Sequence, residues 1–147
     1  KNSGVQRARS LAEYLDTTIA IVDQGETEAD EGYVIGDVQG KNCILVDDIL
    51  NTGKTLANAA ELLKANGANN VYACASHALF SDGAKEVLGQ SEILDICVTD
   101  SCLTEKEQQP QNASYITCSK LLGEGVKRIH ENTPMSPLFN KVDKDFL

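Results

Sequence analysis

The chain has 147 residues, of which 41% are hydrophobic and 24% are charged, and its formal net charge is −9. This length and composition are typical of one soluble globular domain. The negative charge argues against a general binder of nucleic acid or of an anionic membrane surface, because both need a basic face. It leaves open a phosphate ligand, which backbone N–H groups at a helix N-terminus can hold.

The first third of the chain predicts a helix, a strand and a loop. Apolar residues at i, i+3 and i+4 spacing predict a helix over Val5 to Leu15. The β-branched run from Thr18 to Val22 predicts a short strand. Five acidic residues, no basic ones and no apolar period predict a loop from Asp23 to Gly32.

The middle of the chain predicts two strands, a sharp transition and a long helix. After a strand that begins at Tyr33, a second strand has Cys43 to Val46 as its core, and Asp47 is expected to follow the strand end. The pattern "KTLANAAELLKANGA" predicts a helix from Lys54, and Asn66-Gly67 predicts a left-handed stop at its C-terminus.

The remainder of the chain predicts alternating strands and helices. The expected elements are a strand at Asn70 to Ser76, a short helix capped by Ser81 or Asp82, a strand at Glu92 to Asp100, a strand at Ser114 to Cys118 and a helix at Ser119 to Glu131. Strands that alternate with helices indicate an α/β fold with a parallel twisted sheet flanked by helices. Ligands of such sheets bind beyond the carboxyl ends of the strands.

The segment "VDDILNTGKT" carries the strongest functional signal. The first turn of a helix presents unpaired N–H groups and a partial positive charge, and a glycine there lets a ligand approach the backbone. Two carboxylates one loop away can accept hydrogen bonds from vicinal hydroxyls. The segment therefore matches a phosphorylated sugar, with these candidate binding residues: Asp47, Asp48, Asn51, Thr52, Gly53, Lys54 and Thr55.

Two other interpretations of this segment were weighed. "GKT" is part of a nucleotide-binding P-loop, but that motif needs a glycine where this chain has Asp48, so the P-loop interpretation fails. An acidic strand end that only precedes a helix and binds no ligand stays open on the residues alone.

Several segments of the sequence resemble those of a known family. "ILVDDILNTGKT" resembles the ribose-5-phosphate or phosphoribosyl-pyrophosphate (PRPP) loop of type I phosphoribosyltransferases. The spaced segments "ASHALFS", "VTD" and "SPLF" make the chain similar to the C-terminal half of ribose-phosphate pyrophosphokinases (PRPP synthetases) over nearly its whole length. The resemblance implies a phosphoribosyltransferase-like domain over residues 1–139, followed by a tail at 140–147.

The resemblance also implies an activity. The family transfers the β,γ-diphosphoryl group of ATP to the 1-hydroxyl of ribose 5-phosphate with Mg²⁺ and produces PRPP for nucleotide biosynthesis. By motif, Asp47 and Asp48 hold the ribose hydroxyls, and Asn51 to Thr55 hold the 5-phosphate. The expected partners are ribose 5-phosphate, ATP and PRPP, with no nucleic acid and no membrane, in a cytoplasmic homo-oligomer between a dimer and a hexamer.

The chain departs from the family at two places. The family's diphosphate loop has an aspartate that helps hold Mg²⁺, whereas the matching stretch here is Lys1 to Gly4 and has no carboxylate, so the metal ligands of this chain are unknown. The family's flexible loop carries a Lys and an Arg at the positions of Gln24 and Glu26, so the catalytic residues are unknown as well. Phosphoryl transfer needs cations near its transition state, and this loop supplies carboxylates.

Three functions therefore remain. The chain is expected to be part of a ribose-phosphate diphosphokinase that is incomplete alone, because the family's ATP-binding residues lie mostly in its other half. A catalytically weak or regulatory paralogue that still binds ribose phosphate is the alternative. A stand-alone phosphoribosyltransferase is disfavoured, because aromatic residues for base stacking are only 5% of the chain and Trp is absent.

Overall fold

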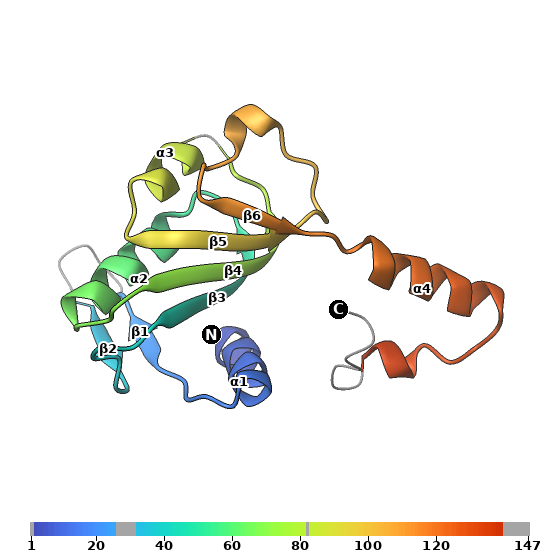
Figure 1. The fold of residues 1–147 in the computed structure, drawn as a ribbon, viewed down its shortest axis with the longest axis horizontal. Coiled ribbons are helices and arrows are strands. Elements are labelled where there is room, and N and C mark those ends of the chain that lie inside the picture. Colours follow the sequence, from blue (N-terminus) through green and yellow to red (C-terminus); the bar gives the residue numbers. More distant parts are fainter. Residues whose placement is uncertain (1, 26–31, 82, 140–147) are drawn as a thin grey trace. The chain divides into compact units, whose positions relative to one another are not determined.

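The computed structural model describes residues 2–25, 32–81 and 83–139. The chain divides into two compact units, Lys1–Tyr115 and Ile116–Leu147, and each is described by itself. The helices and strands, labelled in Figure 1, are α1 (Asn2–Leu15), β1 (Ile21–Asp23), β2 (Tyr33–Ile35), β3 (Cys43–Leu50), α2 (Lys54–Ala65), β4 (Val71–Ala78), α3 (Ala84–Gly89), β5 (Ile93–Thr99), β6 (Ala113–Ile116) and α4 (Ser119–His130).

A four-stranded sheet with the order β3-β4-β5-β6 forms the centre of the first unit (Figure 1). β3 pairs in parallel with β4, and β4 pairs in parallel with β5. The register places Cys43 beside Val71 and Ile49 beside His77. The predicted fold class, a parallel sheet flanked by helices, is confirmed.

The apolar face of α2 packs on this sheet. The spacing of Leu56, Ala59, Ala60, Leu62 and Leu63 predicts this face, and α2 buries all of them except Leu62, which is half-buried. Gly67 adopts φ +87° directly after the helix, and Ala68 N–H donates to the Leu63 carbonyl, so the predicted left-handed stop is confirmed. The core is completed by residues from β3, β4, the segment after β4, α3 and β5: Leu50, Val71, Ala73, Ala75, Ala78, Phe80, Leu88, Ile93, Ile96 and Val98.

Three sequence-based boundaries are wrong. β3 does not end at Val46 but continues through the aspartates to Leu50, because pairing with β4 extends to Ala78. The first strand lies at Ile21–Asp23 and so begins three residues later than Thr18. α3 has Gly83 as its N-cap and no side-chain cap, so the Ser81 side chain does not cap it, and Asp82 lies outside the described residues.

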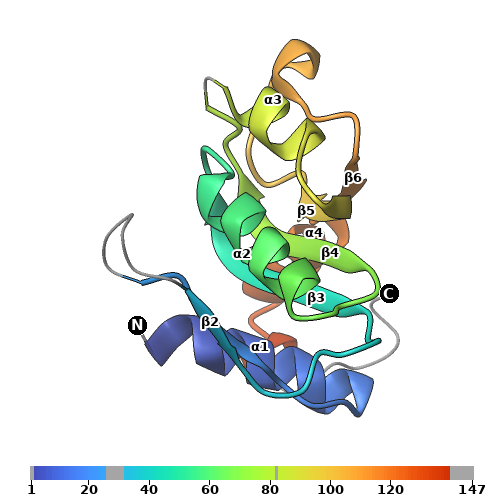
Figure 2. The same cartoon turned by 90° about the vertical axis from the view of Figure 1, so that its left-hand side faces the viewer.

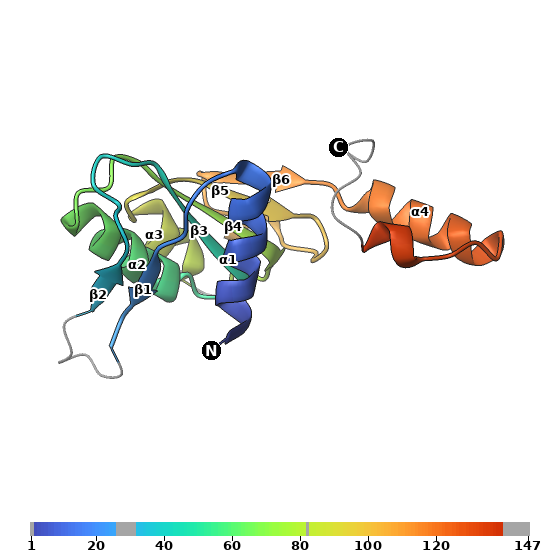
Figure 3. The ribbon, with the colours of Figure 1, turned by 90° about the horizontal axis from the view of Figure 1, so that it is seen from below.

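Two smaller elements frame the sheet. β1 and β2 form an antiparallel hairpin that contacts α2 (Figure 2). α1 packs against β3, the strand that carries the two aspartates (Figure 3). These contacts bring the N-terminal third of the chain to the β3–α2 segment.

In the second unit, the described part folds back along α4. Arg128 pairs with Glu124 at 2.8 Å, and its Nη1 donates to the Pro134 carbonyl at 2.9 Å. Gly125 is the buried residue of α4, and a Cβ there would lie 3.6 Å from Met135 Cε. The predicted domain over residues 1–139 stays a prediction, and the predicted tail at 140–147 lies outside the described residues.

Candidate functional site

The two aspartates lie inside β3 and bend toward their own backbone. Asp47 Oδ1 accepts a hydrogen bond from the Asp48 N–H at 2.8 Å, and Asp48 Oδ1 accepts one from the Ile49 N–H at 3.0 Å. Asp47 is partly buried and Asp48 is exposed. Each carboxylate therefore has one oxygen committed to the strand.

A cation from α1 lies over this acid pair. Arg7 Nη1 is 3.3 Å from Asp48 Oδ2, and Arg7 Nη2 is 3.9 Å from Asp47 Oδ1. Sequence reasoning did not find Arg7. A helical arginine gives no local signal of its partner, and only the packing of α1 on β3 brings the two segments together.

The two carboxyl groups titrate as a pair. Burial is the largest cause that raises the pKa of Asp47 above its usual value of 3.8. The hydrogen bond from Asp47 is the largest cause that lowers the pKa of Asp48. Of the two carboxyl groups, the half-buried Asp47 therefore takes up a proton at the higher pH, and Asp48 stays ionised to lower pH.

The turn after β3 depends on Gly53. Its φ is +76°, and a Cβ there would lie 2.5 to 2.9 Å from the side chain of the fully buried Leu88. Gly53 is the N-cap of α2, and its carbonyl accepts the Ala57 N–H at 2.9 Å. The first-turn N–H groups of α2 thus lie behind a residue that has no side chain to cap them.

The polar residues of this turn face solvent. Asn51, Thr52, Lys54 and Thr55 are all exposed. The Asn51 carbonyl accepts the Ser81 N–H at 3.2 Å, which ties the turn to the segment before α3. The Thr52 and Thr55 hydroxyls and the Lys54 ammonium are therefore open to a ligand.

The start of the acidic segment contacts the same helix. Gln24 Nε2 donates to the Thr55 carbonyl at 2.6 Å, a contact that the sequence did not predict. Tyr33 OH donates to Asp23 Oδ2 at 3.2 Å, and this bond is the largest cause that raises the pKa of Tyr33. Gln24 is thereby held against α2, while Glu26 lies outside the described residues.

Polar side chains also gather at the ends of the two neighbouring strands. His77, on β4, has its Nδ1 2.7 Å from Ser101 Oγ, and Ser101 Oγ donates to the Ser76 carbonyl at 3.1 Å. Thr99 Oγ1 also donates to the Ser76 carbonyl. These groups satisfy one another, and they border the carboxyl edge of the sheet beside the aspartate pair.

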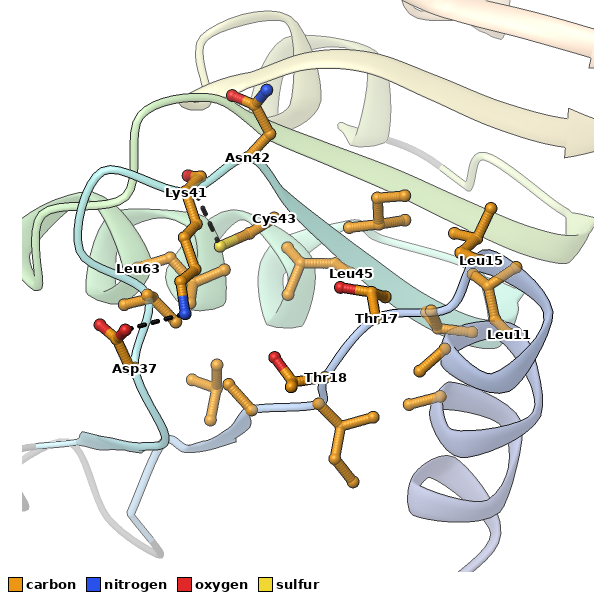
Figure 4. A pocket seen from close by; sticks show the side chains of 18 residues that line it. Leu11, Leu15, Thr17, Thr18, Asp37, Lys41, Asn42, Cys43, Leu45 and Leu63 are labelled. Carbon is orange, nitrogen blue, oxygen red and sulfur yellow. Dashed lines mark hydrogen bonds and ion pairs between the residues drawn. The ribbon is translucent and has the colours of Figure 1, made fainter.

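A cavity of about 160 Å³ lies elsewhere, between α1, the segment after it and β3 (Figure 4). Its lining is largely apolar, and the ion pair between Lys41 and Asp37, at 2.8 Å, lies at one side. No predicted ligand-binding residue lines it. The predicted site is therefore an open surface at the sheet edge and not this cavity.

The described residues offer no cluster of three or more His, Cys, Asp or Glu side chains that could hold a metal ion. Asp47 and Asp48 supply two carboxylates, and both face Arg7. A complete protein-built Mg²⁺ site is thus not found in this part of the chain. Across the same residues, every helix is too short or too polar to cross a membrane.

Comparison with known proteins gives three findings. Residues 32–140 match the family described as the phosphoribosyl synthetase-associated domain. The chain is 62% identical over 141 residues to a protein of Enterococcus faecalis provisionally named ribose-phosphate pyrophosphokinase 1, and 55% identical over 142 residues to one of Streptococcus agalactiae provisionally named ribose-phosphate pyrophosphokinase 2. Each match covers 95% of this chain and 44% of the relative, so the chain spans less than half the length of these relatives.

A solved structure agrees with these matches. The crystal structure of phosphoribosylpyrophosphate synthetase from Mycobacterium smegmatis superposes with a TM-score of 0.77 at 28% identity. The match covers 86% of this chain and 42% of that chain. The resemblance seen in the sequence is confirmed by the family match, the relatives and the shared fold.

Proposed function

This chain belongs to the phosphoribosyl synthetase-associated domain family, and from that premise we propose that it supplies the ribose-5-phosphate site of a ribose-phosphate diphosphokinase. The observation that carries the proposal is the β3–α2 segment. Within nine residues it presents a cation-paired carboxylate pair, a glycine at positive φ and the open start of a helix, from Asp47 to Thr55.

The start of α2 suits the phosphate end of the ligand. Four or so unpaired N–H groups and the helix dipole favour an anion there. The Thr52 and Thr55 hydroxyls add donors, and Lys54 adds a positive charge, all on exposed side chains. Gly53 allows the turn that leads into this helix start, because its φ of +76° and its contact with Leu88 leave no room for a side chain.

The carboxylate pair suits the sugar end. Each aspartate uses one oxygen on the backbone, and the pKa of Asp48 is lowered, with its neighbour Asp47 as the largest cause and Arg7 as a further one. An ionised carboxylate accepts hydrogen bonds from vicinal hydroxyls and rejects a second phosphate by charge. The site therefore distinguishes the two ends of ribose 5-phosphate.

ATP binding is expected to use residues outside this chain. We place the chain in the C-terminal half of the enzyme, and its ATP-binding residues in the rest of a polypeptide more than twice as long. Mg²⁺ usually binds one or two carboxylates together with substrate phosphates. The described residues form no cluster of three or more His, Cys, Asp or Glu side chains for a metal ion.

A catalytically weak or regulatory paralogue is the second candidate, and one observation favours it. The family's loop lysine is Gln24 here, and its amide is engaged with the Thr55 carbonyl at 2.6 Å. A neutral amide offers less stabilisation than a cation to the developing charge of phosphoryl transfer. Such a protein would bind ribose 5-phosphate and turn over slowly.

Isothermal titration of the chain with ribose 5-phosphate, ribose and inorganic phosphate tests the site. Ribose 5-phosphate should bind more tightly than either half-ligand, because it reaches both ends of the segment. Absence of binding by a chain shown to be folded would contradict the proposed function. Transfer of label from γ-labelled ATP into PRPP by the full-length protein then separates the enzyme from the weak paralogue.

Other properties follow from the family and await their own measurements. We propose a cytoplasmic protein that assembles as a homo-oligomer between a dimer and a hexamer, with ATP, ribose 5-phosphate and PRPP as its small-molecule partners. Sedimentation of the full-length protein would establish the number of subunits.

A further inference from the structure

We propose that Arg7 is a positioning residue that holds the Asp47–Asp48 pair in the form that binds ribose hydroxyls. This inference rests on the proposed function and names a residue of α1 that the binding motif does not contain. Arg7 reaches the pair from a different element, 40 residues before Asp47, at 3.3 Å from one carboxylate and 3.9 Å from the other.

The setting of Arg7 differs from that of a surface ion pair. Its side chain is 32% exposed, and its Nε is buried with no hydrogen-bond partner among the described residues. A buried donor without a partner destabilises the folded protein. The packing of α1 therefore holds the arginine in place although its Nε–H group makes no hydrogen bond. The two terminal nitrogens are left to fork across Asp47 and Asp48, as the planar guanidinium allows.

The acid pair needs such a cation. Two adjacent carboxylates repel each other, and burial already favours the protonated form of Asp47. The charge of Arg7 acts in the opposite direction on both groups. Without it, the pair would retain a proton to higher pH and would accept hydroxyl hydrogen bonds less well.

The other charged groups on the elements around β3 do not replace Arg7. Lys54 begins α2, and His77 in β4 is engaged with Ser101. Arg9 and Glu13 lie farther along α1. Among described side chains, Arg7 is the cation within 4.0 Å of either carboxylate.

This role differs from that of a side chain that blocks the hydroxyl site. A blocking side chain would have to leave the hydroxyl site when the ligand arrives, so its removal would raise the affinity for ribose 5-phosphate. The backbone bonds of Asp47 and Asp48 and the fork from Arg7 together fix the carboxylates before the ligand arrives.

The test compares Arg7→Met, Arg7→Lys and Arg9→Met with the parent chain. Arg9→Met is the matched control, because it removes the same charge from the same helix at an exposed position. Isothermal titration gives the affinity for ribose 5-phosphate and for inorganic phosphate. Carboxyl-carbon NMR with labelled aspartate gives the titration of Asp47 and Asp48.

We expect Arg7→Met to weaken ribose 5-phosphate binding about tenfold or more, the scale of a lost charge-assisted hydrogen bond. In Arg7→Met, the affinity for inorganic phosphate should be unchanged and the pKa values of Asp47 and Asp48 should rise. Arg7→Lys should keep part of the affinity for ribose 5-phosphate. Arg9→Met should change neither the affinities nor the carboxyl titration. Unchanged or tighter ribose 5-phosphate binding by Arg7→Met, or an unchanged carboxyl titration, overturns the proposal.

Two further outcomes are distinguishable. If the parent chain binds no ribose 5-phosphate, the proposed function fails, and the inference about Arg7 fails with it. If the parent binds and Arg7→Met binds equally well, only the role of Arg7 fails. Should Arg7→Met not fold, Arg7→Lys carries the test: it loses the fork, so parent-like affinity would contradict the proposal.

Discussion

The β3–α2 segment and the residues directly after β1 meet where Gln24 donates to the Thr55 carbonyl, yet the two segments differ in their charged residues. The first has the acids, the glycine and the hydroxyls that fit a sugar phosphate, and α1 adds Arg7. The second has Gln24 and Glu26 at two positions where the resemblance implies cations. Under the proposed function, the chemistry of binding and the chemistry of turnover reside on separate segments, so one can change while the other is kept.

The largest expected effect concerns the turn that the binding segment requires. Gly53→Ala should destabilise the fold by about 3 kcal/mol, since a left-handed conformation costs about 1–2 kcal/mol and overpacking about 1–3 kcal/mol. The cause is φ +76° together with the overlap on Leu88. Urea unfolding measures the change.

Gly40→Ala is the control for that effect. Gly40 also has a positive φ, +66°, but a Cβ there would meet nothing within 4 Å. Only the backbone cost of about 1–2 kcal/mol should remain. Equal losses for the two variants would show that Leu88 does not restrict the turn.

A smaller effect should separate the sugar end from the phosphate end. Asp48→Asn should weaken ribose 5-phosphate binding about tenfold, because a charge-assisted hydrogen bond is worth roughly 1.5–3 kcal/mol. Binding of inorganic phosphate should be unchanged or slightly stronger, since a nearby negative charge is removed. A parallel loss for both ligands would contradict the division of the segment into two ends.

The second segment can be altered toward the family pattern. Gln24→Lys combined with Glu26→Arg should raise the rate of PRPP formation by the full-length protein about tenfold. This is less than the factor of about 10²–10³ in kcat that one preorganised donor supplies in an active site. Ribose 5-phosphate affinity should change little, because these residues do not belong to the proposed binding set. Parent-like activity in the double variant would show that the missing cations do not limit turnover.

The smallest expected effect is a pH dependence away from both segments. The Lys41 hydrogen bond is the largest cause that lowers the pKa of Asp37 below 3.8. A lowered carboxyl pKa gives stability that is present above pH 3.8 and is lost as pH falls through the folded-state pKa. Melting temperature should therefore fall less steeply below pH 4 in Lys41→Met than in the parent, and identical profiles would contradict this assignment.

The sequence predicted the fold class and the α2 face because those depend on local periodicity. Leu56, Ala60 and Leu63 are buried as their spacing indicates. It misplaced the end of β3 because adjacent aspartates suggest a strand end, whereas pairing with β4 continues the strand to Leu50. Tertiary pairing decided that boundary.

The binding motif was visible in the sequence, but its surroundings were not. Asp48 and Gly53 stand in one continuous segment, so their spacing alone suggests a sugar-phosphate site. Arg7 and Gln24 reach that segment from 41 and 31 residues away in the chain, respectively, at Asp48 and at Thr55. No local pattern encodes such contacts, and only the packed structure brings them together.

Amide NMR of the labelled chain during titration with ribose 5-phosphate tests the central claim most directly. Ribose 5-phosphate should cause saturable shifts at Asp48, Thr52, Gly53, Lys54 and Thr55 and leave the residues around the apolar cavity unchanged. A folded chain in which these five amides stay still at saturating ribose 5-phosphate, or in which only the cavity residues respond, would contradict it.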